Sequence, residues 1–239
     1  MAKTYLEPEE VERLEEAAAY LRDRLLIRLL FRLGCRISEA LGITVDNIDF
    51  NQGTVTIQHL KARIKLSCPG CGSRLSKTAR FCPGCGQRVE KAVAEEKEHR
   101  RVRTLPVDRD TLDMLEEYID HGGPVSQNGK QLLFGIGRGH ARYIIANLAA
   151  KAGLGKLVNP ETGKERNVSP HRLRDAFAVM AVQHNDSTDA IRMLQEHLGH
   201  TNIGTTMKYR KIGSEEHEKW YSQLWEKGNA GTSNGNNQR

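Results

Sequence analysis

The segment Ser-Pro-His-Arg-Leu-Arg at residues 169–174 carries more structural and chemical information than any other stretch of this chain. A serine followed by a proline is a frequent helix start, so the segment predicts a helix that runs to about His184. His171 and Arg174 are three residues apart and therefore share one face of that helix. A proton acceptor beside a permanent cation is suited to chemistry on a phosphate ester.

Four further residues extend this pattern along the chain. Arg36 stands in Gly-Cys-Arg-Ile-Ser-Glu, Lys61 ends a β-type run, His200 ends Leu-Gly-His, and Tyr209 follows nine residues later. Cleavage of a phosphodiester requires stabilised charge on the non-bridging oxygens, a nucleophile, and a proton for the leaving oxygen. The set contains side chains for each of these tasks, without a metal or a nucleotide in the chemistry.

Each residue receives a predicted role. Arg36 and Arg174 clamp the phosphate, because a guanidinium is planar and stays charged at any working pH. Tyr209 is the nucleophile. Its phenol has an ordinary pKa of about 10, so it needs a base, for which we predict His171. His200 bonds a phosphate oxygen or positions the tyrosine.

The proton for the departing 5′ oxygen is assigned to Lys61, which we expect at a strand end. Arg63 and Lys65 lie close enough in the sequence to serve instead.

Two identical Cys-Pro-Gly-Cys knuckles interrupt this catalytic pattern and predict a metal site. Their cysteines are Cys68, Cys71, Cys82 and Cys85. Four thiolates in two tight turns suit one tetrahedral Zn²⁺ in a zinc-ribbon-like module, and they leave no open position for catalysis. The module is too small to fold by burial alone, so the metal is expected to supply its folding energy. Disulfides and an iron–sulfur cluster are the alternatives, and disulfides are disfavoured without a secretory signal.

The positive charge of the chain is concentrated around these knuckles. The 239 residues carry a net charge of +6, but residues 61–91 hold eight basic residues against one acidic residue, so the rest is close to neutral. Such a patch favours a polyanionic partner, although a solvated basic surface is the simpler interpretation. We expect four of its side chains to contact DNA phosphates, namely Arg74, Lys77, Arg80 and Arg88. The competing hypothesis is that the ribbon binds a protein.

The chain is predicted to be α+β and mainly helical, with a small β-sheet. Residues 54–57 form a strand that continues to about Lys61, and residues 101–107 form its partner, so that the cysteine module lies at the tip of their hairpin. We divide the chain into a discontinuous catalytic domain at 1–65 and 100–227, an inserted module with a charged connector at 66–99, and a disordered tail at 228–239. A first helix is expected to start at about residue 8, and further helices are expected near residues 22–33, 38–41, 108–121, 140–152, 169–184, 189–198, 202–209 and 214–226.

Localisation is inferred from the composition of the first residues and from the way the cysteines are used. Residues 1–10 are acidic and lack the apolar core of a signal peptide, and the sequence has no apolar run of membrane-spanning length. Cysteine usage fits a reducing compartment, with Cys35 left over from the metal spacing. We therefore expect a cytoplasmic protein.

Taken in order, these motifs resemble the catalytic domain of tyrosine recombinases, the phage-integrase and Xer-like family. The resemblance covers about residues 6–225 apart from the cysteine insert, and it implies the family fold. It also implies double-stranded DNA as substrate, cleavage to a 3′-phosphotyrosyl link with a free 5′ hydroxyl, and a homotetramer on two DNA sites. Glu39 matches the family motif as a residue that supports Arg36. Residues 214–226 are the candidate for the C-terminal segment that family members exchange, and packing on their own domain is the alternative.

Several positions depart from the family pattern. Asp175 stands where family members often carry a second histidine, and we expect little loss because that position is not catalytic. Lys61 stands about one residue away from the position of the lysine in Xer-like patterns. The insert occupies a place where the family normally has a short hairpin. The N-terminal helical domain that usually closes the DNA clamp is missing, as in a fragment or a minimal enzyme.

Two other functions remain open at this point. A DNA-binding regulator with this fold would not perform strand exchange and would have no chemical need for all six catalytic positions. A type IB topoisomerase-like enzyme would share the chemistry but would relax supercoiled DNA without a specific site.

Overall fold

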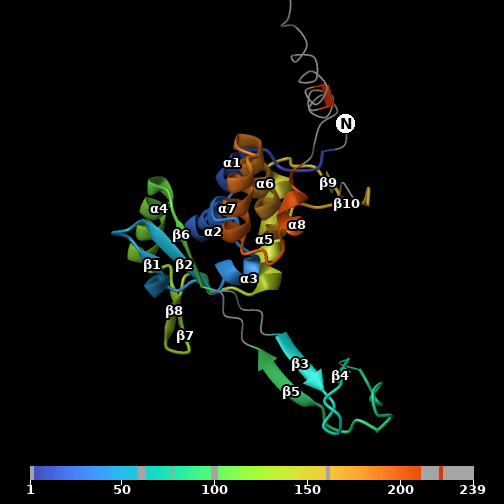
Figure 1. The fold of residues 1–239 in the computed structure, drawn as a ribbon. Helices are drawn as coiled ribbons and strands as arrows, with labels where there is room; N and C mark the ends of the chain where they lie inside the picture. The colour runs from blue at the N-terminus through green and yellow to red at the C-terminus, as the bar shows by residue number, and fades with distance from the viewer. Residues whose placement is uncertain are drawn as a thin grey trace, which may run out of the picture.

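The computed structural model of the chain describes residues 3–58, 63–76, 78–97, 102–159, 162–210 and 221–222. A body of helices with a small sheet at one side makes up most of it, and the cysteine segment forms a sheet of its own (Figure 1). The α+β, mainly helical class that the sequence predicts is therefore confirmed.

The helices follow the expected order with small shifts at their ends. They are α1 (Pro8–Glu16), α2 (Leu21–Arg32), α3 (Ile37–Ala40), the 3₁₀ turn η1 (Val45–Asn47), α4 (Arg109–Asp120), α5 (Arg138–Lys151), α6 (Pro170–His184), α7 (Thr188–Leu198) and α8 (Ile203–Met207). The helix expected at 214–226 lies outside the described residues, apart from Tyr221 and Ser222, and so does the tail at 228–239.

Within the described residues the strands are short and form four separate sheets. They are β1 (Ile48–Asp49), β2 (Thr54–Gln58), β3 (Arg63–Ser67), β4 (Arg74–Leu75), β5 (Val93–Lys97), β6 (Val102–Pro106), β7 (Val125–Gln127), β8 (Lys130–Leu132), β9 (Leu157–Val158) and β10 (Glu165–Arg166). Three of them make the sheet β1-β2-β6, and three others make the sheet β4-β3-β5 of the cysteine segment.

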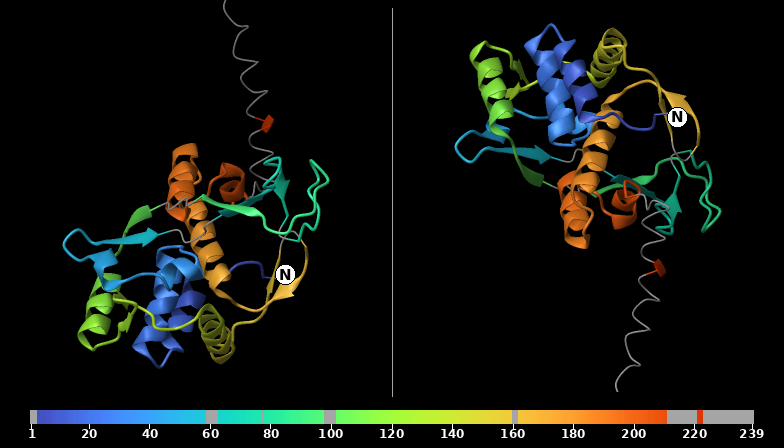
Figure 2. Two further views of the ribbon diagram at one scale, coloured as in Figure 1. Left: turned by 90° about the horizontal axis from the view of Figure 1, so that it is seen from below. Right: turned by 90° about the horizontal axis from the view of Figure 1, so that it is seen from above.

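Helix α2 is the centre of the hydrophobic core. Its apolar residues Leu25, Leu26, Leu29 and Leu30 are fully buried. It contacts α1, α3, α4 and α6, and Figure 2 shows α6 lying between α2 and α7. The arginines of α2 lie on the rest of its surface, where their charged ends can reach water. This packing fixes the position of α6, which carries two of the predicted site residues, His171 and Arg174.

The pairing of residues 54–57 with residues 101–107 is confirmed. Strand β2 runs antiparallel to β6 in register from Thr54 opposite Pro106 to Gln58 opposite Val102. Val55 and Ile57 point into the core, where Leu105 meets them from the facing strand. The cysteine segment therefore interrupts this hairpin, as expected.

Three local expectations need correction. The stretch 87–100, interpreted as a charged connector, contains β5, which pairs with β3 from Arg63 opposite Lys97 to Ser67 opposite Val93. The stretch 154–168, to which the sequence assigns no helix or strand, contains the short hairpin β9–β10. Ser169 precedes α6 in extended conformation, but its side chain makes no capping hydrogen bond. Strand β5 depends on a partner strand distant in sequence, which local patterns do not report.

No helix in the part of the chain that the structure describes is long and apolar enough to cross a bilayer.

Candidate active site and metal centre

Arg174 is deeply buried at the predicted site. Its side chain is 2% exposed. Nη1 donates to the carbonyl of Gly34 at 2.7 Å, and Nη2 donates to the carbonyl of Leu198 at 2.8 Å. The guanidinium therefore joins the ends of α2 and α7 to α6. A planar group held at both ends is oriented before any substrate arrives, which reduces the entropy lost on binding.

Glu39 collects three guanidinium groups around one carboxylate. Its Oε1 accepts from Arg36 Nη1 at 2.9 Å, its Oε2 accepts from Arg103 Nη2 at 2.9 Å, and Arg174 Nη1 lies 4.0 Å from Oε2. Oε2 also accepts the backbone N–H of Arg36 at the start of α3. The support that the sequence assigns to Glu39 extends here to two further arginines. Three positive charges against one negative charge leave the cluster with a surplus of two.

The surplus changes the acid–base properties of the cluster. Burial, followed by the nearby charge of Arg36, lowers the pKa of Arg174 to about 10. Arg174 is still charged at neutral pH, but burial and the repulsion from Arg36 destabilise its charged form. An anion that entered the cluster would relieve this repulsion, so the site is electrostatically prepared for a phosphate.

His200 lies against Arg174 and has a defined tautomer. Arg174 Nη2 lies 3.0 Å from His200 Nε2, and because a guanidinium only donates, Nε2 accepts. Nδ1 therefore carries the proton and donates to Thr206 Oγ1 at 2.9 Å. Burial, followed by the charge of Arg174, lowers the pKa of His200 to about 4, so the ring is neutral at neutral pH.

The motif Leu-Gly-His at 198–200 has a clear structural basis. Leu198 supplies the carbonyl that holds Arg174, and its side chain is fully buried. Gly199 has φ +66, and a Cβ there would lie 2.2 Å from Arg103 Nη1. The glycine thus ends α7 in a left-handed turn and leaves room for the Arg103 side chain.

Tyr209 reaches the same site from the end of α8. Its ring stacks near that of His200, with centroids 6.4 Å apart and planes inclined by 16°. Its hydroxyl donates to Asp175 Oδ1 at 2.8 Å. Burial, followed by the negative charge of Asp175, raises the pKa of Tyr209, so the phenol is protonated at neutral pH.

The structure thus brings together Arg36, Glu39, Arg174, His200 and Tyr209. His171 lies at the edge of this group: its side chain is 72% exposed, and Nε2 is 3.8 Å from Asp175 Oδ1. Lys61 lies outside the described residues.

Two residues at the site were missed in the sequence. Arg103 was interpreted only as part of a strand, but its side chain is 11% exposed and binds Glu39. Within the described part of the chain its buried Nη1 has no hydrogen-bond partner. Asp175 was expected to matter little, but it holds the hydroxyl of Tyr209. A charged residue in the apolar part of a strand or helix was the available signal for both.

The four cysteines of the two knuckles lie together, as the spacing predicts. Their four Sγ atoms lie within 4.8 Å of one another. The shortest pairs are Cys71–Cys82 at 3.4 Å and Cys68–Cys85 at 3.7 Å. A tetrahedral ion with metal–sulfur bonds of about 2.3 Å requires sulfurs about 3.8 Å apart, so the cluster is suited to a metal ion.

The backbone of the two knuckles is repeated almost atom for atom. Gly72 N donates to Cys68 O at 2.9 Å, and Gly86 N donates to Cys82 O at 3.0 Å. Both glycines have positive φ, +71 and +72. In the second knuckle Gly84 N also donates to Cys82 Sγ at 3.3 Å, which stabilises a thiolate.

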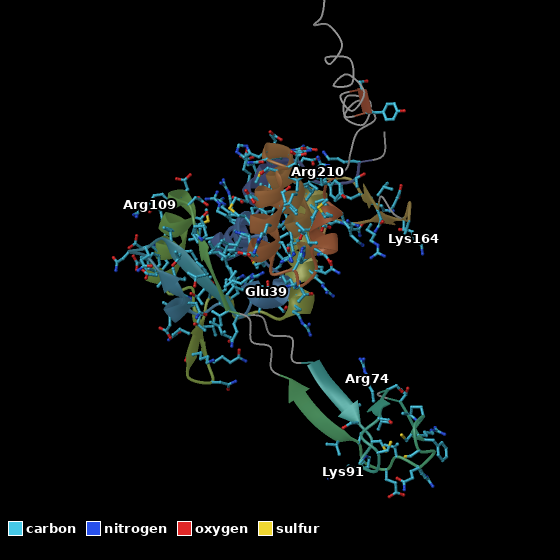
Figure 3. The ribbon with its side chains drawn as sticks, in the orientation of Figure 1. Glu39, Arg74, Lys91, Arg109, Lys164 and Arg210 are labelled. Carbon is cyan, nitrogen blue, oxygen red and sulfur yellow. The ribbon has the colours of Figure 1, made fainter. Side chains whose placement is uncertain are left out.

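Basic side chains are exposed around the cysteine cluster. Arg74, Arg80 and Arg88 are all exposed, and Arg74 is labelled in Figure 3. Lys77, the fourth predicted contact, lies outside the described residues.

Comparison with known proteins gives a consistent result. The model of the phage integrase family matches residues 4–216. The tyrosine recombinase XerD of Neisseria meningitidis serogroup B is 25% identical over 202 residues, which covers 81% of this chain and 52% of the relative. The tyrosine recombinase XerC of Staphylococcus aureus is 26% identical over 207 residues, which covers 87% of this chain and 54% of the relative. The chain therefore spans about half the length of these relatives.

Solved structures share the fold. The XerA recombinase superposes with a TM-score of 0.60 at 20% identity, over 93% of this chain and 64% of that one. The XerH site-specific recombinase bound to its difH substrate gives 0.60 at 21% identity, over 94% and 55%. The Tn1549 transposon integrase in complex with transposon right end DNA gives 0.59 at 16% identity, over 94% and 66%.

Proposed function

Because the chain belongs to the phage integrase family, we propose that it is a site-specific DNA recombinase or integrase that cleaves and rejoins double-stranded DNA through Tyr209. The observation that carries the proposal is the meeting of Tyr209, His200 and the arginine cluster within one site. These residues come from α3, α6 and the segments after α7 and α8, and each is held by named hydrogen bonds.

Phosphate binding is assigned to Arg36 and Arg174. The scissile phosphodiester carries one negative charge, which the surplus charge around Glu39 would stabilise more strongly as charge builds on the non-bridging oxygens. Arg103, with a buried donor that has no partner among the described residues, adds to the same field. His200 acts through Arg174 and Tyr209, because its Nε2 is engaged by the guanidinium and its ring lies beside the phenol.

The chemical step transfers a phosphoryl group to the tyrosine. Tyr209 Oη forms a bond to phosphorus, the bond to the 5′ oxygen breaks, and the 3′ phosphate remains attached to the protein. His171 takes up the tyrosine proton, and Lys61 protonates the departing oxygen. The phosphotyrosyl link retains the bond energy, so a strand can be rejoined without ATP.

The cysteine cluster is proposed to hold one structural Zn²⁺, with Cys68, Cys71, Cys82 and Cys85 as its ligands. We further propose the segment 66–99 as an inserted module of a discontinuous catalytic domain at 1–65 and 100–227. Two such chains on each of two DNA sites would form the working tetramer.

The proposed activity is tested by trapping the covalent intermediate. Wild-type protein is incubated with a library of randomised nicked duplexes, and DNA-linked protein is recovered under denaturing conditions. We expect an adduct in wild type, none in Tyr209→Phe, and a wild-type level in Tyr143→Phe, which removes an exposed hydroxyl on α5. No adduct from any duplex, or an adduct that survives Tyr209→Phe, would refute the proposal. Sequence preference among the recovered duplexes would separate it from a nicking–closing enzyme.

The basic surface of the insert is proposed to contact DNA phosphates. Each phosphate contact contributes about 0.9 to the slope of log affinity against log salt concentration. Replacing Arg74, Lys77, Arg80 and Arg88 with alanine should therefore flatten this slope. A control with Arg109→Ala and Arg192→Ala, two exposed arginines on α4 and α7, should keep the wild-type slope. An unchanged slope in the insert variant would favour a protein partner for the ribbon.

A further inference from the structure

Asp175 has no role in the chemistry described above, although its carboxylate touches the proposed nucleophile. Tyr209 Oη donates to Asp175 Oδ1 at 2.8 Å, and Asp175 is 5% exposed. The other carboxylate oxygen, Oδ2, accepts from Arg172 Nη1 at 3.2 Å. Arg172 is itself buried on α6, so it holds the carboxylate with Oδ1 turned toward the phenol.

His171 lies farther from the same carboxylate oxygen than Tyr209 does. Its Nε2 is 3.8 Å from Asp175 Oδ1, which is longer than a hydrogen bond, and most of its ring is exposed. The carboxylate, and not the imidazole, is therefore the group that the phenol contacts through this hydrogen bond. A proton that leaves Tyr209 along this hydrogen bond reaches Asp175 first.

We propose that Asp175 is the catalytic residue that directly accepts the proton of Tyr209 during strand cleavage, and that His171 receives this proton from Asp175. The inference rests on the proposed function, in which Tyr209 attacks phosphorus. As the new O–P bond forms, the O–H bond of Tyr209 breaks and its proton moves to Asp175 Oδ1. The bond to the 5′ oxygen breaks with its electron pair, and that oxygen takes a proton from Lys61. In the rejoining step each proton returns along the same path.

Electrostatics explains why one contact can both restrain and activate the nucleophile. The carboxylate opposes a phenolate beside it, because two negative charges would then share a buried site; this contributes to the raised pKa of Tyr209. The opposition disappears when the carboxylate itself takes the proton, since the pair then keeps a single negative charge. The phenol thus stays protonated at rest, and its proton has a destination when phosphorus comes within reach.

The test compares Asp175→Asn, Asp175→His and wild type in adduct formation on a duplex recovered from the library. Asparagine keeps the size and can still accept a hydrogen bond, but it takes no proton. We expect Asp175→Asn to bind DNA like wild type and to cleave about 100-fold more slowly or worse at pH 7. Its rate should rise about tenfold per pH unit, because the phenol must then lose its proton to solvent, whereas wild type stays flat over the same range. Asp175→His, which can accept a proton, should recover most of the rate.

Two results would overturn the assignment. Wild-type cleavage by Asp175→Asn would mean that the carboxylate only restrains Tyr209. A slow variant with the wild-type pH profile would mean that Asp175 only supports the structure.

A second measurement needs no DNA. Protein containing 3-fluorotyrosine is titrated by ¹⁹F NMR, and the resonance of residue 209 is identified by its loss in Tyr209→Phe. Asp175→Asn should lower the pKa of that phenol, while Asp186→Asn, which removes an exposed carboxylate bonded to Arg210, should leave it unchanged. An unchanged pKa in Asp175→Asn would refute the contact. A shifted pKa together with no adduct from wild type would instead show that the proposed function has failed while the contact stands.

Discussion

Arg174 Nη1 donates to the carbonyl oxygen of Gly34 at 2.7 Å across 140 residues of the chain. The side chain expected to hold the phosphate therefore also joins two helices of the core. Its replacement would affect folding and chemistry together, so variants of its neighbours separate these effects more cleanly.

Gly34→Ala tests the left-handed turn that aims this carbonyl. Gly34 has φ +53, and an added Cβ would lie 2.5 Å from Phe177 Cδ1 and 2.9 Å from Leu198 Cδ2. Backbone strain and overpacking should together lower the free energy of unfolding by about 2–4 kcal/mol, measured by urea denaturation. Gly155→Ala is the matched control, since nothing lies within 4 Å of its Cβ. Equal losses in the two variants would contradict the interpretation.

Glu39→Gln tests the charge balance of the arginine cluster. The side chain of Glu39 is 1% exposed, and its removal leaves three guanidinium groups without their shared counter-charge. The free energy of unfolding should fall by about 3–5 kcal/mol. Added sulfate should raise the Tm of this variant more than that of wild type, because an anion can replace the carboxylate. Glu196→Gln, which breaks only an exposed pair with Arg192, should change neither quantity.

His200 should make stability depend on pH. Its pKa is lowered to about 4, first by burial and then by the charge of Arg174. The unfolded chain, with an ordinary value near 6.5, binds more protons between these limits, so the free energy of unfolding falls as pH drops from 6.5 toward 4. The loss is on the order of 2 kcal/mol, allowing for partial screening.

This pH effect is checked by denaturation at several pH values. His200→Gln should show a flatter profile, and His184→Gln, at the exposed end of α6, should follow wild type. Burial also lowers the pKa of His197 in the same direction, but both variants keep that residue, so the difference reports His200. Parallel profiles for His200→Gln and wild type would exclude the assigned environment.

Cys71→Ser should remove the metal without harming the helices. Wild type is expected to contain one zinc ion per chain by elemental analysis, and the variant much less. Limited proteolysis should then cut within the segment of β3 to β5, while the Tm of the helical body is retained. Cys35→Ala, which changes a buried cysteine outside the cluster, should keep its zinc. Full zinc content in Cys71→Ser would exclude Cys71 as a ligand.

Much of this fold follows from local patterns in the sequence. The start of α6 at Pro170 follows from proline's fixed φ at a helix start, and the β2–β6 pairing follows from two β-branched segments. The convergence at Arg174 follows instead from the resemblance of its neighbours' motifs to those of the tyrosine recombinase family, and not from local patterns. Strand β5 does not follow, because its sequence is charged and its conformation comes from pairing with β3.

The contacts of Asp175 and Arg103 could not be predicted from the sequence. Asp175 meets Tyr209 only because the chain after α7 turns back over α6, 34 residues later. Arg103 meets Glu39 from 64 residues away, across the whole insert. Both residues are charged and lie among residues that are expected to be buried. A buried charge needs a partner, so the sequence indicates that a partner exists but does not identify it.

The ladder between β2 and β6 has a consequence for how this protein can be rebuilt. Gln58 and Val102 face each other in it, so the chain departs and returns at points about 5 Å apart. An unrelated folded unit with adjacent ends could replace the segment of β3 to β5, with Lys61 retained, without altering Val55, Ile57 or Leu105. The hairpin is thus a single attachment point, at which the insert can be exchanged while the residues that surround Arg174 keep their places.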